Sequence, residues 1–398
     1  MKNIVNIFVL KIYLMVTIVG AFLFFVSCSD NDDVENGNET ICGESVFFYI
    51  PYNIDIDTCI NSDIEEVKDI VATYGRTLLS NRRILIYKFK HVKRAYLFEL
   101  KYEDGKCICD TLGNYEFNDN ATNYATTSGL TSVLNELKSK APAQTYSMIV
   151  ECHGMGWVPA DTIFKLKARK KAFGSFINNN SDYLTDITTL ADALEAADMD
   201  LNLLAFDDCY MAQAEIAYEL RNRVRYLVGS VCEVAADGIP YSSSFISLIN
   251  RDFQTYLDAY KAYYSGKGNK VNAMNSVIDC SKIEVMANVM KEINSQYSYD
   301  SSDGNSELMA YDGYSEHIFF DMADYVNAFV PDGALKANFN AALSDLVPYN
   351  TYGETCYSKG NGAIWAVDSC CGITLSDPTL NASLLTVKEQ TAWWAATH

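Results

Sequence analysis

The sequence predicts an α/β fold with a mainly parallel sheet. Short apolar runs alternate along the chain with segments whose apolar residues recur at helical spacing. Such alternation is typical of βαβ units, in which helices cover both faces of a buried parallel sheet. The composition agrees, because 398 residues with 49% hydrophobic and 21% charged side chains are ordinary for a globular protein of one large or two smaller domains.

The individual elements follow from these patterns. The runs predicted to be strands are residues 45–51, 83–89, 94–100, 146–152, 201–206 and 225–231. The segments predicted to be helices are residues 61–75, 128–140, 185–199, 210–223 and 281–294. In the first helix, Ser62 and Glu65 fit a capping box, and Gly75 stands where a C-cap glycine would. Beyond residue 250 the pattern loosens, and "GAIWAVDSCCGITL" is strand-like. We therefore expect a core over residues 41–250 and a C-terminal α+β extension or small domain over residues 251–398.

The N-terminus has the features of a targeting segment. Lys2 and Lys11 supply positive charge before an apolar run that extends from Ile12 to Val26. The sequence "FFVSC" at the end of this run resembles a bacterial lipobox, in which Cys28 would be the lipidated residue. We interpret residues 1–27 as a lipoprotein signal peptide; the alternative is an uncleaved membrane anchor. Both interpretations export the chain and tether it at a membrane.

Residues 28–40 are polar and acidic, which is typical of a flexible tether. Their "SDNDD" resembles the surface-export signal of Bacteroidetes lipoproteins. The predicted location is therefore the bacterial cell envelope, with the chain lipid-anchored in the outer membrane and exposed at the surface.

Charge and cysteine content limit the partners and the redox state. The net charge is −20, and it becomes −22 once residues 1–27 and their two lysines are removed. Such a chain repels phosphate backbones, so we expect no nucleic-acid partner, whereas cationic peptides are favoured. Twelve cysteines in an exported protein permit disulfides, but their connectivity does not follow from the sequence.

Two strand ends carry the residues of a candidate catalytic site. His153 follows the strand "YSMIVEC", and Cys209 follows the strand "LNLLAF" and precedes a predicted helix. Ligands of parallel sheets bind at the carboxyl ends of the strands, so these side chains should meet at one edge. A helix N-terminus would lower the pKa of the Cys209 thiol, and His153 would manage its proton. The N–H groups of Gly154 and Cys209 could together form an oxyanion hole.

Strand alternation argues against a Cys152–His153 pair, because adjacent side chains face opposite ways. Cys152 is expected to be a packed thiol or one half of a disulfide. A metal site built from Cys152, His153 and Cys209 is a further alternative, but adjacent strand residues chelate one ion poorly. No metal is therefore assigned to these residues.

Several motifs, in order, resemble the clostripain family (C11) of clan CD cysteine peptidases. They are "HGMGW", "SDYLTDITTLADAL", "FDDCYM", "VGSVCEVAADGIPY" and "SCCGITLSDP", and the resemblance covers roughly residues 45–395. It implies a caspase-like α/β/α sandwich and an endopeptidase that cleaves after Arg or Lys. Departures from the family pattern, such as Ile239 in place of Trp, bear on specificity more than on catalysis.

The resemblance also assigns roles to residues. Cys209 matches the nucleophile and His153 the catalytic histidine. Asp207 and Asp237 match the acids of a specificity pocket for a basic side chain, which a carboxylate would bind. The plainer interpretations are a helix cap for Asp207 and a turn former for Asp237.

A basic run, "FKLKARKKAFG" at residues 164–174, stands out in an acidic chain. It is either a solvated loop or, since members of the resembled family cut themselves in this linker, a self-processing site in a zymogen. Lys167 is the first choice for the cleaved residue.

Two alternatives stay open for function and cofactors. The same fold could serve a catalytically inactive surface binding lipoprotein. No cofactor is expected to be required, although calcium is compatible with the resemblance and with acid-rich stretches such as "DSSDG" at residues 300–304.

Overall fold

The computed structural model describes residues 41–51, 55–117, 124–163, 184–302 and 304–398, and residues 41–398 form one compact unit. Their centre is a nine-stranded sheet with the strand order β10-β8-β7-β6-β5-β1-β2-β3-β4. The strands of this sheet are β1 (Cys42–Ile50), β2 (Arg82–His91), β3 (Arg94–Glu103), β4 (Lys106–Glu116), β5 (Ala143–Glu151), β6 (Leu201–Asp207), β7 (Val224–Gly229), β8 (Asn275–Asp279) and β10 (Tyr349–Thr351). The five strands from β7 to β2 run parallel, and antiparallel pairs extend the sheet at both ends.

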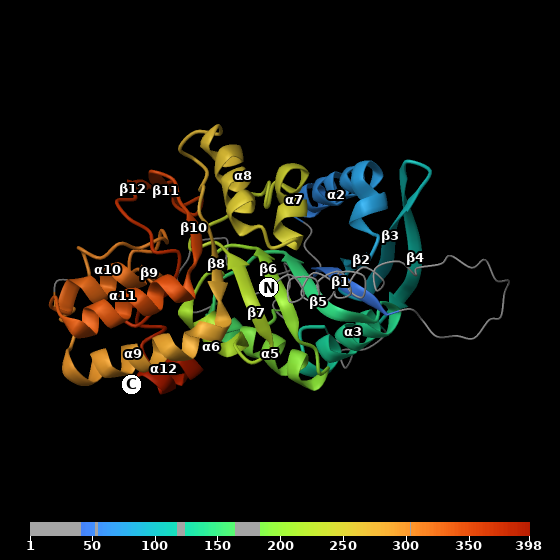
Figure 1. The fold of residues 1–398 in the computed structure, drawn as a ribbon. Coiled ribbons are helices and arrows are strands. Elements are labelled where there is room, and N and C mark those ends of the chain that lie inside the picture. The colour runs from blue at the N-terminus through green and yellow to red at the C-terminus, as the bar shows by residue number, and fades with distance from the viewer. Residues whose placement is uncertain (1–40, 52–54, 118–123, 164–183, 303) are drawn as a thin grey trace, which may run out of the picture. The chain divides into compact units, whose positions relative to one another are not determined.

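Helices cover both faces of the sheet (Figure 1). On one face lie α2 (Asp57–Leu78), α7 (Tyr241–Ile249) and α8 (Phe253–Ser265). On the other lie α3 (Thr127–Lys140), α5 (Ile187–Ala196) and α6 (Ala214–Leu220). Successive residues of β1 alternate between the two hydrophobic cores, with Phe47 in one core and Phe48 in the other. The predicted α/β fold with a mainly parallel sheet is thus confirmed.

The C-terminal part of the chain continues the same unit. It contributes β8 and β10 to the large sheet. Its other elements are α9 (Ile283–Gln296), β9 (Phe320–Asp321), α10 (Met322–Phe329), α11 (Ala334–Leu346), β11 (Thr355–Tyr357), β12 (Ile364–Ala366), β13 (Thr374–Leu375) and α12 (Ala392–Thr397). None of the helices in the described ranges has the length and apolar composition needed to cross a membrane.

Two expectations about helix ends are wrong. Helix α2 begins at Asp57, so Ser62 and Glu65 lie inside it and form no capping box. Gly75 also lies inside α2, where an added Cβ would come within 2.6 Å of the Tyr102 Cβ atom. Close packing of α2 on β3, and not helix termination, therefore accounts for this glycine.

Candidate active site

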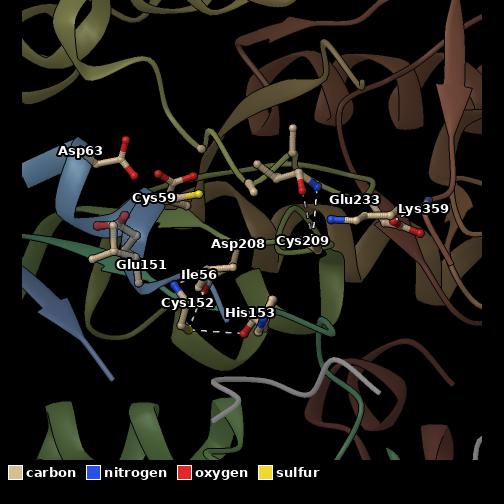
Figure 2. Close-up of a pocket in the computed structure, with 16 residues that line it drawn as sticks. Ile56, Cys59, Asp63, Glu151, Cys152, His153, Asp208, Cys209, Glu233 and Lys359 are labelled. Atoms are coloured by element: carbon tan, nitrogen blue, oxygen red, sulfur yellow. Dashed lines mark hydrogen bonds between the residues drawn. The ribbon is translucent and has the colours of Figure 1, made fainter. Parts of the chain in front are cut away.

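The site lies where β5 and β6 end side by side. These strands are parallel neighbours, and their last residues, Glu151 and Asp207, are register partners. His153 follows β5 and Cys209 follows β6, each two residues beyond this pair. The carboxyl edge of the sheet thus brings the two predicted residues to one cavity, which both line (Figure 2).

The loops after β5 and β6 are packed tightly together. A Cβ atom added to Gly154 would lie 2.4 Å from the Cys209 carbonyl oxygen, so only glycine allows this approach. Farther along, the Gln213 side chain accepts a hydrogen bond from the Trp157 N–H at 3.0 Å. These contacts fix the histidine-bearing loop against the cysteine-bearing loop.

Cys209 sits in a sharp turn, not at a helix N-terminus. The next residue, Tyr210, has a φ of 62°, and α6 begins only at Ala214. The Val234 N–H donates to the Cys209 Sγ at 3.2 Å, but burial outweighs this bond and raises the pKa of the thiol. The expectation that Cys209 lies at a helix N-terminus, which would lower this pKa, is therefore wrong.

His153 contacts a carboxylate that the sequence did not single out. Its Nε2 lies 3.1 Å from Asp55 Oδ2, in the segment between β1 and α2. The His153 side chain is only 14% exposed. Asp55 therefore orients the imidazole, and it occupies the position of a third residue beside His153 and Cys209 in the candidate catalytic site.

Cys152 lines the same cavity as the candidate nucleophile, but its hydrogen bonds go to Asp208. Its thiol donates to Asp208 Oδ2 at 3.4 Å and its N–H donates to Asp208 Oδ1 at 2.7 Å. Burial raises the pKa of Asp208 to about 8. Cys152 belongs to the hydrophobic core, as strand alternation predicts, and all eleven cysteines of the described ranges are free thiols.

Three buried carboxyl groups form the floor of the cavity: Asp63 from α2, Glu151 from β5 and Asp207 from β6. One carboxylate oxygen of each lies within 4.8 Å of the other two. Burial is the largest cause that raises the pKa of each. The charge of Asp207 raises the pKa values of Asp63 and Glu151 further, and the hydrogen bond between Asp63 and Glu151 raises the pKa of Glu151 and lowers that of Asp63. We call these three residues the acid triad.

Asp207 also holds the loop that follows β7. Its carboxylate accepts hydrogen bonds from the Ile239 N–H at 2.8 and 2.9 Å and from the Tyr241 hydroxyl at 3.1 Å. Gly238, with a φ of 58°, lets this loop approach, since an added Cβ would lie 2.4 Å from the carboxylate. Asp207 is therefore not a cap of α6.

Asp237 does not join Asp207 in the cavity. Its carboxylate forms an ion pair with Lys267 and accepts a hydrogen bond from the Tyr263 hydroxyl. It is half exposed and is not among the cavity-lining residues. The structure thus brings together Asp207, His153, Gly154 and Cys209 but leaves Asp237 outside.

Sequence reasoning missed three acids of this site. Glu151 ends an otherwise apolar run, and Asp63 lies on the apolar face of its helix, between Ile60 and Ile64. An unpaired charge on a buried face was the available signal. Asp55 follows the carboxyl end of β1, the neighbour of β5, which was a weaker signal.

Potential metal ligands of the described residues gather at one place, the acid triad. Calcium takes six to eight oxygen ligands. The acid triad is the only group of candidate ligands found within the described ranges, and water or a ligand would have to complete the shell of an ion bound there. Cys152, His153 and Cys209 do not form such a group there. Three positions singled out from the sequence lie outside the described residues. They are the self-cleavage candidate Lys167, the lipidation candidate Cys28 and residue 303 of the "DSSDG" stretch.

Comparisons with known proteins agree with this site. The family model of the clostripain family, Peptidase_C11, matches residues 36–362. A secreted C11 cysteine protease from Bacteroides thetaiotaomicron, "iotapain", shares 37% identity and a TM-score of 0.82, over 90% of this chain and 100% of its own.

Two further solved structures are similar. A clostripain from Bacteroides thetaiotaomicron, in complex with the peptide inhibitor BTN-VLTK-AOMK, shares 40% identity and a TM-score of 0.53, over 56% of this chain and 99% of its own. An inactive zymogen C11 protease from Parabacteroides distasonis shares 22% identity and a TM-score of 0.74, over 90% and 99%, and supports the fold alone. No curated protein matched. The caspase-like fold is thereby confirmed, and the chain belongs to the clostripain family of cysteine peptidases.

Proposed function

We propose that the chain is an exported, lipid-anchored cysteine endopeptidase that cleaves peptide bonds after Lys or Arg. One observation carries this proposal: His153 and Cys209 line a cavity whose floor is the buried acid triad. A thiol and an imidazole at the rim suit acyl transfer, and carboxylates at the floor suit a basic side chain.

The proposed chemistry proceeds through an acyl-enzyme. The Cys209 thiol gives its proton to His153, and the sulfur attacks the scissile carbonyl carbon. His153 then protonates the leaving amine as the carbon–nitrogen bond breaks. Water hydrolyses the resulting thioester, which releases the new carboxyl group and returns the proton to the sulfur. Asp55, 3.1 Å from the imidazole, holds the ring in orientation through both steps.

The oxyanion would be bound by two backbone N–H groups. In the described part of the chain, the N–H groups of Gly154 and Cys209 donate to no other protein group. Gly154 packs closely on Cys209, which lines the cavity. Such preorganised donors stabilise the charge that develops on the carbonyl oxygen.

The specificity for a basic residue at the cleaved bond rests on Asp207. It is buried at the cavity floor, and its hydrogen bonds to Ile239 and Tyr241 hold it in place. The peptide inhibitor of the 40% identical relative, VLTK, ends in lysine, which supports the same choice here. Asp237 would take part only if its ion pair with Lys267 opened.

The direct test is a cleavage profile of the purified chain on a peptide library. The wild type should cut after Lys and Arg, and Cys209→Ala should lose all cleavage. Cys280→Ala is the matched control, since this thiol packs in the core and does not line the cavity, and it should keep most of the activity. Wild-type protein that binds basic peptides without cutting them would favour the inactive binding lipoprotein instead.

Lipid anchoring and self-processing extend the proposal to the N-terminus and to residues 164–174. The sequence supports both, through the lipobox-like "FFVSC" and the basic run that contains Lys167. Replacing Cys28 with Ala should move the protein from the membrane to the soluble fraction. Nicking near Lys167 should vanish in pure Cys209→Ala protein, and nicking that persists there would refute self-cleavage.

The proposed chemistry requires no metal. Thiol, imidazole and backbone N–H groups supply the nucleophile, the proton donor and the oxyanion site. Activity should therefore survive a chelator, and loss of activity that calcium restores would overturn this part of the proposal.

A further inference from the structure

The cavity is lined by a buried carboxyl group, that of Glu151, which is hydrogen-bonded to Asp63 but has one oxygen without a partner. Glu151 is 3% exposed, and its Oε2 has no hydrogen-bond partner. A buried polar atom without a partner costs free energy, so such atoms are rare in proteins unless a ligand satisfies them. Because Glu151 lines the same cavity as Cys209, a substrate group is the natural ligand (Figure 2).

The charged residues around Glu151 do not provide it with a counter-ion, so a cationic ligand would be favoured there. Among the described residues, no ion pair engages any member of the acid triad. Lys88, which attracts Glu151 from a distance, is already paired with Asp57 at 2.8 Å. Lys359 lines the cavity, but its ammonium forms no ion pair with the described residues. The cavity therefore gathers three buried acids whose charge, when ionised, one positive group would balance.

The spacing of the acid triad suits an ammonium group. Three acceptors placed about 2.8 Å from a single nitrogen lie up to roughly 4.8 Å apart. The triad oxygens all lie within 4.8 Å of one another, so one Nζ can donate its three N–H bonds to the three residues. A guanidinium instead presents its donors in a planar fork that fits one carboxylate at a time. The cavity, about 70 Å³, also favours the more compact group.

We propose that Asp63 and Glu151 act with Asp207 as a three-carboxylate receptor for the lysine ammonium, which makes the enzyme prefer Lys over Arg at the cleaved bond. This inference rests on the proposed function and adds two specificity-determining residues to it. Both residues would touch the substrate side chain at its charged end, away from the reacting carbonyl. Removing either should therefore change the choice of substrate more than the chemistry.

The experiment measures kcat/KM for two peptides that differ only in Lys or Arg before the cleaved bond, with a chelator present throughout. We expect the wild type to favour the Lys peptide by about tenfold or more. Glu151→Gln and Asp63→Asn, each near in shape to the original, should lower kcat/KM for Lys by about tenfold and for Arg by less. The Lys-to-Arg ratio is thus expected to fall in both variants.

Glu65→Gln is the matched control. It removes one negative charge from the same helix, α2, but Glu65 is exposed and pairs with Lys68 outside the cavity. Its Lys-to-Arg ratio should equal that of the wild type. A thermal melt of each variant shows that it is folded, so that a changed ratio reports on the pocket.

The experiment distinguishes failure of this inference from failure of the proposed function. An enzyme that cuts after both residues but prefers Arg, or whose ratio survives both triad substitutions, overturns the inference and leaves the proposed function standing. An enzyme that cuts neither peptide but cuts after neutral or acidic residues overturns the proposed function itself.

Discussion

The two edges of the central sheet differ in whether their buried acidic side chains form ion pairs. At the amino edge, arginines meet carboxylates: Arg82 pairs with Glu44, Arg83 with Glu99 and Arg225 with Asp279 at 2.7–2.8 Å. At the carboxyl edge, Glu151 and Asp207 are equally buried, yet neither forms an ion pair within the described residues.

The pKa values show the same contrast. Burial alone would raise the pKa of Glu44, but hydrogen bonds from Ser147 and Arg251 and the charges of Arg82 and Arg251 lower it. Burial raises the pKa of Glu151 with no cation close enough to reverse the shift. Ionisation of the buried acid Glu44 at the amino edge therefore stabilises the fold, whereas ionisation of Glu151 at the carboxyl edge lowers stability unless a cationic ligand binds it.

The largest effect is expected at the carboxyl edge, from Gly154→Ala. The new Cβ would lie 2.4 Å from the Cys209 carbonyl oxygen, so the two loops must separate. Loss of the oxyanion geometry should lower kcat by on the order of 100-fold or more. Steady-state kinetics on a Lys peptide measures it, and a variant with wild-type kcat would show that the close packing of these loops is dispensable.

At the amino edge, Glu44→Gln should reduce stability without changing specificity. The substitution leaves Arg82 and Arg251 without their shared counter-charge, which should cost about 3 kcal/mol of unfolding free energy. Urea denaturation measures this loss. The Lys-to-Arg ratio of the folded variant should be unchanged, and a shifted ratio would break the separation of roles between the edges.

The third prediction concerns pH and the variant Glu151→Gln. Because burial raises the pKa of Glu151, the folded chain binds this proton more tightly than the unfolded chain does, and wild-type stability falls as pH rises above the ordinary carboxyl value. The variant should therefore melt at a higher temperature than the wild type at pH 8, and the difference should vanish below pH 4. The charged or titratable groups that face Glu151 are Asp63, Asp207, Lys88, Cys152 and Tyr241.

Glu44→Gln should show the reverse pH dependence. The lowered pKa of Glu44 gives stability that is present above its ordinary value and is lost as pH falls through the folded-state value. The melting difference from wild type should therefore shrink in acid. Melting curves of the two variants with the same pH trend would contradict the comparison.

The smallest effect is expected from Glu195→Gln. Arg223 contacts three exposed acids, namely Glu195, Asp198 and Asp200, so the loss of one leaves two. Exposed ion pairs contribute little, and we expect neither stability nor activity to change measurably. A clear drop in melting temperature would show that this exposed network stabilises the fold.

Much of this site follows from strand order alone. The periodic segments predicted β5 and β6, and parallel pairing then predicts that His153 and Cys209 meet at one edge. The position of Asp63 depends on how α2 packs across the sheet, which local patterns do not encode. The thiol pKa was mispredicted because the turn at Tyr210 delays α6 by four residues.

The central claim is that the carboxyl edge presents one reactive thiol above an acidic pocket. Labelling with two acyloxymethyl ketone peptides, identical except for Lys or Glu at the reactive end, tests it most directly. Mass spectrometry should find the Lys peptide joined to Cys209 by a thioether, no adduct in Cys209→Ala and little adduct from the Glu peptide. Equal labelling by both peptides, or an adduct on another cysteine, would contradict the account.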